Sequence, residues 1–115
     1  MIMSSTAEKE CSDRIAREFA SELRRRLGDQ VQKIILYGSR ARGDFHEWSD
    51  FDFVVVVEPN GRNLRELSEE IVTVAGEILH RYDLLVSAQV LAPEAWDFEQ
   101  FGPWGLNVQE EGVSI

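Results

Sequence analysis

Residues 37–57 read YGSRARGDFHEWSDFDFVVVV, and this stretch decides most of what the sequence predicts about the fold. Its last part, residues 51–57, is aromatic and β-branched, which is typical of a buried strand. The turn cluster Pro59-Asn60-Gly61 ends that strand. Immediately upstream, residues 31–37 form a second apolar run around Ile34, Ile35 and Leu36. We therefore expect two strands separated by a linker over 38–50.

Helical periodicity surrounds these strands. Residues 7–27 place Ile15, Phe19, Leu23 and Leu27 on one stripe, and residues 64–82 carry a similar apolar stripe. A third strand is expected over 83–91, followed by a short helix that begins at Pro93. This order predicts an α/β (α+β) fold, a two-layer sandwich with a small mixed sheet. One domain is expected over 7–115, with residues 1–6 disordered.

Charge and cysteine content restrict the classes of function. The 115-residue chain has 12 basic and 21 acidic residues and a net charge of −9, so nucleic acid is unfavourable as a main ligand. The single cysteine, Cys11, excludes an internal disulfide. The N-terminus does not have the pattern of a secretory signal, and the longest apolar stretch, 53–57, is too short to span a bilayer. These features predict a cytoplasmic protein with no membrane role.

The turn that follows the first strand is a candidate anion site. Glycine at position 38 permits a close approach of the backbone to a ligand, and Ser39 is expected to cap a short helix that begins at Arg40. Backbone N–H groups at a helix start attract anions. The alternative is an ordinary turn, since most Gly-Ser turns bind nothing.

Two carboxylates at the start of the second strand form a candidate cation site. Residues two apart in a strand point to the same face, so Asp50 and Asp52 are expected side by side while Phe51 and Phe53 enter the core. Neighbouring carboxylates repel each other unless a cation lies between them, and Mg2+ prefers such hard oxygen ligands. The alternative is a solvated start of a strand that tolerates acids.

The two candidate sites are more specific together than apart. Gly38-Ser39, ten intervening residues and Asp50-x-Asp52 resemble the signature of the polymerase β-like nucleotidyltransferases. The short form, with Arg40-Ala41-Arg42-Gly43 and Ser49-Asp50, is similar to the minimal nucleotidyltransferase (MNT) family. If the two strands are antiparallel neighbours, the anion and cation sites meet at one edge of the sheet.

The resemblance implies a polymerase β-like nucleotidyltransferase fold and the attack of a hydroxyl on the α-phosphate of a nucleoside triphosphate, with ATP as the expected donor and Mg2+ as cofactor. It implies metal binding by Asp50 and Asp52. It also implies a nucleotide-binding set that consists of Gly38, Ser39, Arg40, Arg42 and Ser49. Members of the MNT family commonly pair with a small helical HEPN-type toxin, which implies a protein partner for this chain.

A third carboxylate completes the metal site in active members of the family, and its position in this chain stays open. Asp83 is the favoured candidate, but Ser87 is expected on the same face of the third strand. If Ser87 takes the place of the acid, the domain acts as a nucleotide-binding or protein-binding antitoxin module with weakened catalysis. A small-molecule transferase is disfavoured, because such enzymes usually need an additional helical domain.

Overall fold

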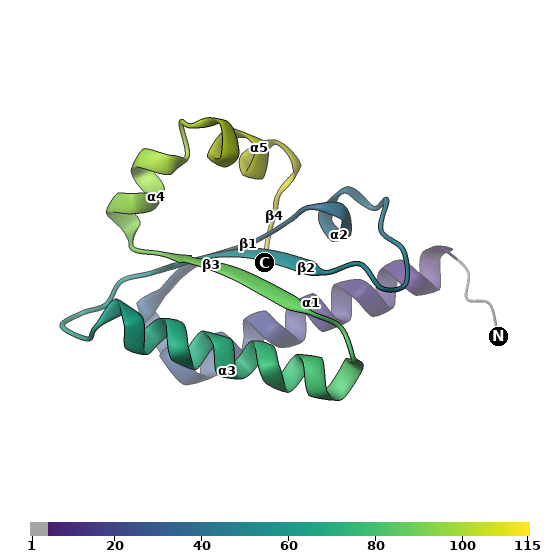
Figure 1. The fold of residues 1–115 in the computed structure, drawn as a ribbon, viewed down its shortest axis with the longest axis horizontal. Coiled ribbons are helices and arrows are strands. Elements are labelled where there is room, and N and C mark those ends of the chain that lie inside the picture. The colour runs from purple at the N-terminus through teal and green to yellow at the C-terminus, as the bar shows by residue number, and fades with distance from the viewer. Residues whose placement is uncertain (1–4) are drawn as a thin grey trace.

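The computed structural model describes residues 5–115, and its helices and strands alternate along most of the chain (Figure 1). The strands are β1 (Val31–Tyr37), β2 (Phe51–Val57), β3 (Val86–Leu91) and the two-residue β4 (Val113–Ser114). The helices are α1 (Ser5–Leu27), α2 (Ser39–Arg42), α3 (Leu64–Tyr82), α4 (Pro93–Glu99) and α5 (Pro103–Glu111), with a 3-10 turn at Gly28–Gln30.

The strands form one mixed sheet in the order β3-β2-β1-β4. Strands β1 and β2 are antiparallel, with Tyr37 opposite Asp52. Strands β2 and β3 are parallel, with Asp52 beside Ser87. Strand β4 adds a short antiparallel edge to β1. The predicted small mixed sheet with packed helices is therefore confirmed.

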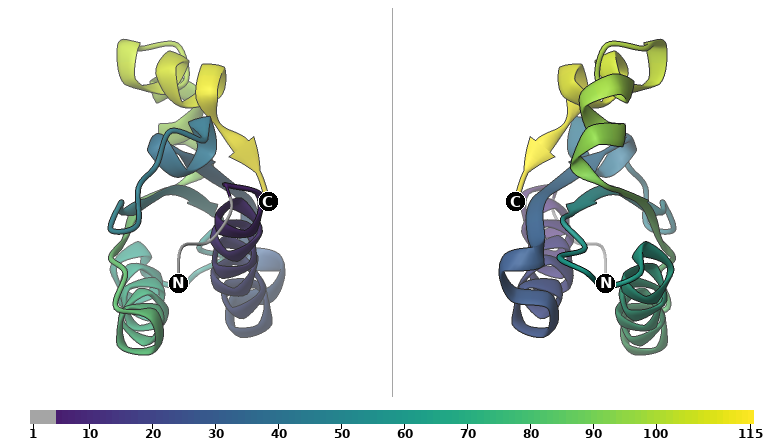
Figure 2. Two further views of the ribbon diagram at one scale, coloured as in Figure 1. Left: turned by 90° about the vertical axis from the view of Figure 1, so that its right-hand side faces the viewer. Right: turned by 90° about the vertical axis from the view of Figure 1, so that its left-hand side faces the viewer.

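One side of the sheet, which we call the closed face, is covered by α1 and α3, and the first turns of α1 extend beyond the strands (Figures 1 and 2). Alternate residues of β2, including Phe51 and Phe53, enter this core and are fully buried. Phe19 of α1 packs on Phe53 with ring centroids 4.6 Å apart. The apolar stripes of both long helices meet here, which is the burial that their periodicity predicts.

The opposite side, which we call the site face, is covered only in part by α4 and α5 (Figures 1 and 2). Its smaller core joins Val54 and Val56 of β2 to Trp96 and Val108. Because side chains alternate along a strand, Asp52 lies on this face with Val54 and Val56. The chemistry-bearing acid and the large aromatic core of β2 are thus on opposite sides of the same strand.

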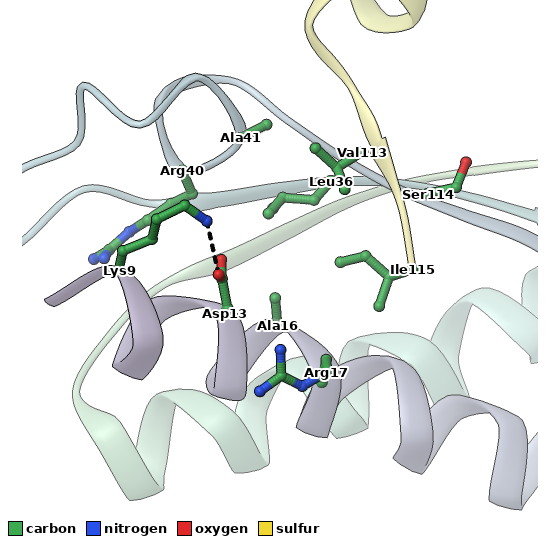
Figure 3. A pocket seen from close by; sticks show the side chains of 10 residues that line it. All are labelled: Lys9, Asp13, Ala16, Arg17, Leu36, Arg40, Ala41, Val113, Ser114 and Ile115. Carbon is green, nitrogen blue, oxygen red and sulfur yellow. Dashed lines mark hydrogen bonds and ion pairs between the residues drawn. The ribbon is translucent and has the colours of Figure 1, made fainter. Parts of the chain in front are cut away.

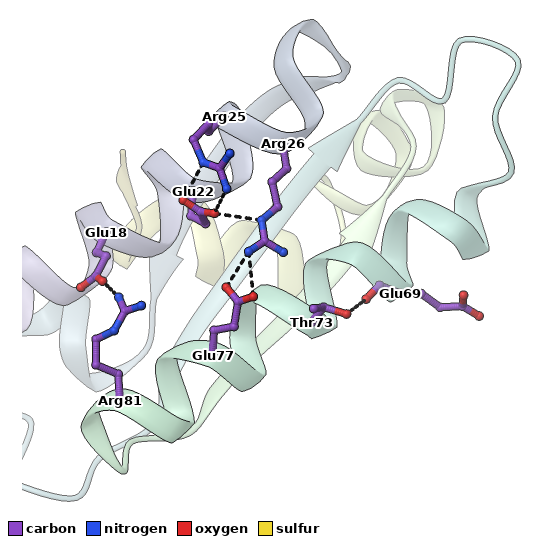
Figure 4. Close-up of polar contacts among 8 residues, drawn as sticks. All are labelled: Glu18, Glu22, Arg25, Arg26, Glu69, Thr73, Glu77 and Arg81. Carbon is purple, nitrogen blue, oxygen red and sulfur yellow. Dashed lines mark hydrogen bonds and ion pairs between the residues drawn. The ribbon is translucent and has the colours of Figure 1, made fainter.

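Ion pairs connect the two long helices beneath the closed face (Figure 4). Arg26 of α1 contacts Glu77 of α3 at 2.7 Å and Glu22 of its own helix at 2.9 Å. Arg81 of α3 pairs with Glu18 of α1. These pairs are solvent-accessible, so each contributes at most about 1 kcal/mol to stability. They account for Arg26 in the basic end of α1 without any ligand.

The predicted bounds of β1, β2 and α3 agree with the structure, two other expectations are wrong, and two elements were not predicted. Helix α1 begins at Ser5, so residues 5 and 6 are helical; residues 1–4, also expected to be disordered, lie outside the described residues. Strand β3 begins at Val86. Helix α5 and strand β4 were not expected. Among residues 5–115, no helix has the length and apolar character needed to cross a membrane.

Candidate functional site

The turn after β1 brings the backbone of Gly38 against the carboxylate of Asp52. Gly38 has φ 76°, a conformation that favours glycine, and a Cβ at this position would lie 2.7 Å from Asp52 Oδ2. Gly38 is itself the N-cap of α2, which begins at Ser39. The expectation that Ser39 caps a helix starting at Arg40 is therefore wrong by one residue. The predicted meeting of the glycine turn and the acid is confirmed for Gly38 and Asp52.

The two acids that precede and enter β2 are coupled electrostatically. Asp52 is partly buried, whereas Asp50 is exposed immediately before the strand. Burial raises the pKa of the Asp52 carboxyl, and the negative charges of Asp50 and Glu111 raise it further, while Arg42 lowers it. The ionised acids therefore repel each other, and a divalent cation would relieve that repulsion. The chemistry of this donor set fits Mg2+.

The side chain of Arg40 is bonded into the linker between the two halves of the motif. Its side chain is buried, with the guanidinium 4.5 Å from the centroid of Phe45 and 4.4 Å from that of Phe51. It donates to the carbonyl oxygen of Ser49 at 2.9 and 3.1 Å and to that of Glu47 at 3.2 Å. The polar contacts of Arg40 are therefore made to the loop that leads to Asp50. It positions the loop.

Arg42, two residues further, points to the opposite side of α2 and meets the C-terminal part of the chain. Its Nη1 lies 3.0 Å from Glu111 Oε2, and its Nε lies 3.3 Å from Asp44. The other oxygen of Glu111 accepts a hydrogen bond from the Gly38 N–H at 2.9 Å. Sequence reasoning missed Glu111, although Pro103 and Gly112 bracket a nine-residue helix and could have indicated α5.

The remaining predicted nucleotide-binding residue, Ser49, is folded into the loop. Its hydroxyl accepts from the backbone N–H of His46 at 3.0 Å, and its own N–H donates to the His46 carbonyl at 3.1 Å. Together with the contacts to Arg40, these bonds fix the backbone one residue before Asp50. Ser49 therefore stabilises the conformation of the loop immediately before Asp50.

The structure separates the two candidates for the third carboxylate. Asp83 ends α3 as its C-cap in the left-handed conformation, with φ 57°, and lies three residues before β3. Ser87 lies beside Asp52 in the parallel register. Residues 5–115 contain no group of three acidic, histidine or cysteine side chains arranged to hold a metal. The expectation that a strand begins at Asp83 is therefore wrong, because Asp83 caps α3, which ends at Tyr82 as predicted, and β3 begins only at Val86.

A pocket of about 360 Å³ opens between α1, α2 and β4, and Figure 3 shows its lining. Lys9, Arg17 and Arg40 contribute three cations to it, and Lys9 pairs with Asp13 at 2.8 Å. Neither Asp50 nor Asp52 lines it. Because neither acid lines the pocket, it is not the site described above.

A family model and several known proteins match this chain in sequence or in fold. The family model of the nucleotidyltransferase domain matches residues 16–100. Two proteins of Methanocaldococcus jannaschii, each named "Putative protein adenylyltransferase", are similar to the chain. One is 36% identical over 73 residues, which are 64% of this chain and 72% of the relative. The other is 28% identical over 100 residues, which are 87% of this chain and 93% of the relative.

Solved structures share the fold at low identity. A "putative nucleotidyltransferase" from Sulfolobus solfataricus has a TM-score of 0.57 at 20% identity, with 99% of this chain and 87% of that chain covered. A toxin–antitoxin complex with AMP-PNP has a TM-score of 0.53 at 20% identity, and the match covers 84% of this chain and 69% of that chain. A mutant of the toxin–antitoxin MntA–HpeT also has a TM-score of 0.53 at 20% identity, and the match covers 86% of this chain and 70% of that chain.

Proposed function

The chain belongs to the nucleotidyltransferase domain family, and from that premise we propose that it moves AMP from ATP to a hydroxyl of a partner protein with the help of Mg2+. The observation that carries the proposal is the contact between the Gly38 turn and the Asp52 carboxylate. A polyphosphate on the turn and a cation on the acids would be direct neighbours. That is the arrangement which a metal-bound triphosphate requires.

In this proposal Asp50 and Asp52 hold the metal. Bound Mg2+ would neutralise the charge of the phosphates and lower the barrier to displacement of pyrophosphate. The chain's own residues position the reactants: Gly38 and Ser39 offer backbone and hydroxyl donors to the phosphates, and Arg42 adds a cation beside them. Arg40 and Ser49 act at a distance, because they fix the loop on which Asp50 lies.

The acceptor is proposed to come from another chain. The relatives from M. jannaschii carry names of protein adenylyltransferases, and two of the structures with this fold are toxin–antitoxin complexes. The described residues supply one sheet with its helices and no separate lobe for an acceptor. We therefore propose a small helical toxin of the HEPN type as the partner, with this chain as its antitoxin.

A second candidate function rests on one observation, the serine beside Asp52. If the metal site needs a third acid at the position of Ser87, the chain binds Mg2+-ATP and its partner but transfers AMP slowly or not at all. The protein would then neutralise its partner by forming a complex. Both candidates predict nucleotide binding, and only the first predicts a covalently labelled partner.

The experiment measures binding and transfer separately. Affinity for AMP-PNP is measured by calorimetry with and without Mg2+, for the wild type and for Asp50→Asn and Asp52→Asn. Transfer is measured with ATP labelled at the α-phosphate and the purified product of the neighbouring gene. We expect Mg2+-dependent binding in the wild type and a loss of transfer of at least about 100-fold in each variant, the scale of one lost catalytic electrostatic contact.

An exposed acid on α4 provides the matched control. Asp97→Asn makes the same change of charge away from the site and should leave both readouts unchanged. Binding without any labelled product would favour the second candidate. AMP-PNP affinity that is equal with and without Mg2+, and equal in all variants, would contradict both.

A further inference from the structure

The carboxylate of Glu111 occupies the donors that a phosphate group would use. One oxygen accepts from the Gly38 N–H at 2.9 Å, and the other lies 3.0 Å from Arg42 Nη1. The Glu111 side chain is only 14% exposed. A carboxylate and a phosphate make the same demand here, since each accepts charge-assisted hydrogen bonds from a backbone N–H and a guanidinium. Glu111 is thus an anion from the chain itself, seated beside Asp52.

This contact is made in unfavourable electrostatic surroundings. The chain carries a net charge of −9, and the charge of Glu111 adds to that of Asp50 in raising the pKa of Asp52. The repulsion is offset by the two donors that Glu111 receives. Arg42 is paired in turn with Asp44, so its positive charge is shared between two acids.

The backbone that carries Glu111 is fixed independently of this contact. Gly112 follows it, and a Cβ at Gly112 would lie 2.6 Å from Ile35 Cγ2 and 2.3 Å from the Val108 carbonyl oxygen. Strand β4 then pairs with β1 through Leu36 opposite Val113 and Ile35 opposite Ser114. The backbone at the end of α5 is therefore packed against the sheet and does not move freely. Glu111 can leave Gly38 only by a rotation of its side chain.

Resting on the proposed function, we propose that Glu111 is an internal competitor of the triphosphate, and that the nucleotide binds only by displacing its carboxylate from Gly38 and Arg42. The Gly38 N–H carries one hydrogen and serves one strong acceptor at a time. A phosphate oxygen and Glu111 therefore exclude each other at this donor. The consequence is a site whose nucleotide affinity is set by a residue of α5.

The test compares two neighbouring glutamates at the end of α5. Glu111→Ala removes the competing anion, whereas the control Glu110→Ala removes the same charge from an exposed position. Dissociation constants for AMP-PNP and for inorganic triphosphate, both with Mg2+, are measured by calorimetry on the full chain. Glu111→Ala should bind both about tenfold more tightly than the wild type, the scale of one charge-assisted hydrogen bond that no longer has to be broken. Glu110→Ala should stay within about twofold.

A second variant and a second measurement distinguish a change in nucleotide binding from a failure of the Glu111→Ala variant to fold. Glu111→Gln keeps an oxygen for the Gly38 N–H but loses the charge, so its affinities should fall between those of the wild type and Glu111→Ala. The amide proton of Gly38, followed by NMR, should shift upfield in Glu111→Ala and should also move when triphosphate is added to the wild type.

Three results overturn the inference. Unchanged affinity in both Glu111 variants would show that the carboxylate does not compete. Weaker Mg2+-dependent binding in both would make Glu111 a metal or nucleotide ligand; in either case the proposed function stands. Absence of Mg2+-dependent binding in the wild type and in every variant would overturn the proposed function as well.

Discussion

Along β2, neighbouring residues belong to two faces that are built differently. Phe51 and Phe53 enter the closed face, where α1 and α3 bury them completely. Asp52 and Val54 turn to the site face, which α4 and α5 cover only in part. Burial of apolar side chains on the closed face stabilises the fold. On the site face, by contrast, acidic side chains that repel one another lie close together. The same strand thus anchors the fold on one side and presents the chemistry on the other.

Helix α2 shows the same division over one turn. Arg40 points toward the closed face and stacks on Phe51, and Arg42 points toward the site face and meets Glu111. Residues two apart on a helix lie on nearly opposite sides. Two arginines that look alike in the sequence therefore have different tasks, one in positioning the loop and one beside the predicted phosphates.

The largest expected effect is a difference in the free energy of unfolding between a substitution on the closed face and one on the site face. Phe53→Ala should lower the free energy of unfolding by about 4 kcal/mol, because it leaves a cavity under the centre of the sheet. Urea denaturation measures the change. The control is Phe98→Ala on α4, whose side chain is 80% exposed and whose removal should change stability by less than about 0.5 kcal/mol. Equal losses in both variants would remove the distinction between the faces.

The next effect separates the two arginines of α2. Arg40→Ala should lower stability by about 2 kcal/mol, since it breaks hydrogen bonds from a charged group to the Ser49 and Glu47 carbonyls. Arg42→Ala removes a more exposed side chain and should cost less than about 1 kcal/mol. Urea denaturation of both variants gives the comparison. A larger loss for Arg42→Ala would contradict the structural role of Arg40.

A smaller effect concerns the position beside Asp52. Ser87→Asp should lower stability by about 1 kcal/mol without metal, because it adds a further negative charge beside acids that already repel each other. Added Mg2+ should reverse the loss and raise the rate of transfer if this is the position of the missing acid. Ser87→Asn is the uncharged control. A metal-independent loss in Ser87→Asp would show that its carboxylate does not reach the ion.

The smallest effect is a gain of stability. The pKa of Asp52 is raised in the folded state, so its ionised form opposes folding above that pKa and the penalty disappears as the pH falls below the ordinary value of the acid. Asp52→Asn should therefore be more stable than the wild type at pH 7 by about 0.5 kcal/mol, after allowance for solvent screening. The difference should vanish near pH 3, about one unit below the ordinary pKa.

Urea denaturation at both pH values measures this gain, and Asp97→Asn on α4 is the matched control, since it removes the same charge from an exposed position. A variant that is less stable than the wild type at pH 7 would mean that Asp52 is stabilised, not strained, by its surroundings.

The sequence predicted the parts of the fold that local pattern determines. Strands β1 and β2 and helix α3 have strong periodicity, and the side chain of Asn63 caps α3 at its start. The start of β3 was harder to predict, because Asp83 adopts a left-handed cap conformation that is uncommon for residues other than glycine and does not begin the strand. Strand β4 has only two residues and depends on tertiary packing, which a local pattern does not contain, whereas Pro103 and Gly112 give α5 a local signal.

Only the part of the candidate site that lies within one short sequence motif could be predicted from the spacing of its residues. Gly38 and Asp52 belong to a motif and meet as expected. The separation of Arg40 from Arg42 depends on how α2 is turned on the sheet. Glu111 is separated from Gly38 by 73 positions, and only the completed fold brings them together. Contacts of this kind have no signal in a single sequence.

The Arg40 side chain, held between two rings and bonded to the Ser49 carbonyl, has a consequence for protein engineering. The segment 43–46 cannot be exchanged freely, because Phe45 is one of those rings and His46 exchanges two hydrogen bonds with Ser49. Position 48 differs, since its side chain is 62% exposed while the residues on either side of it have their carbonyls bound by Arg40. A fluorescent reporter attached at position 48 would therefore sense occupancy of the site without altering the contacts that hold Asp50 in place.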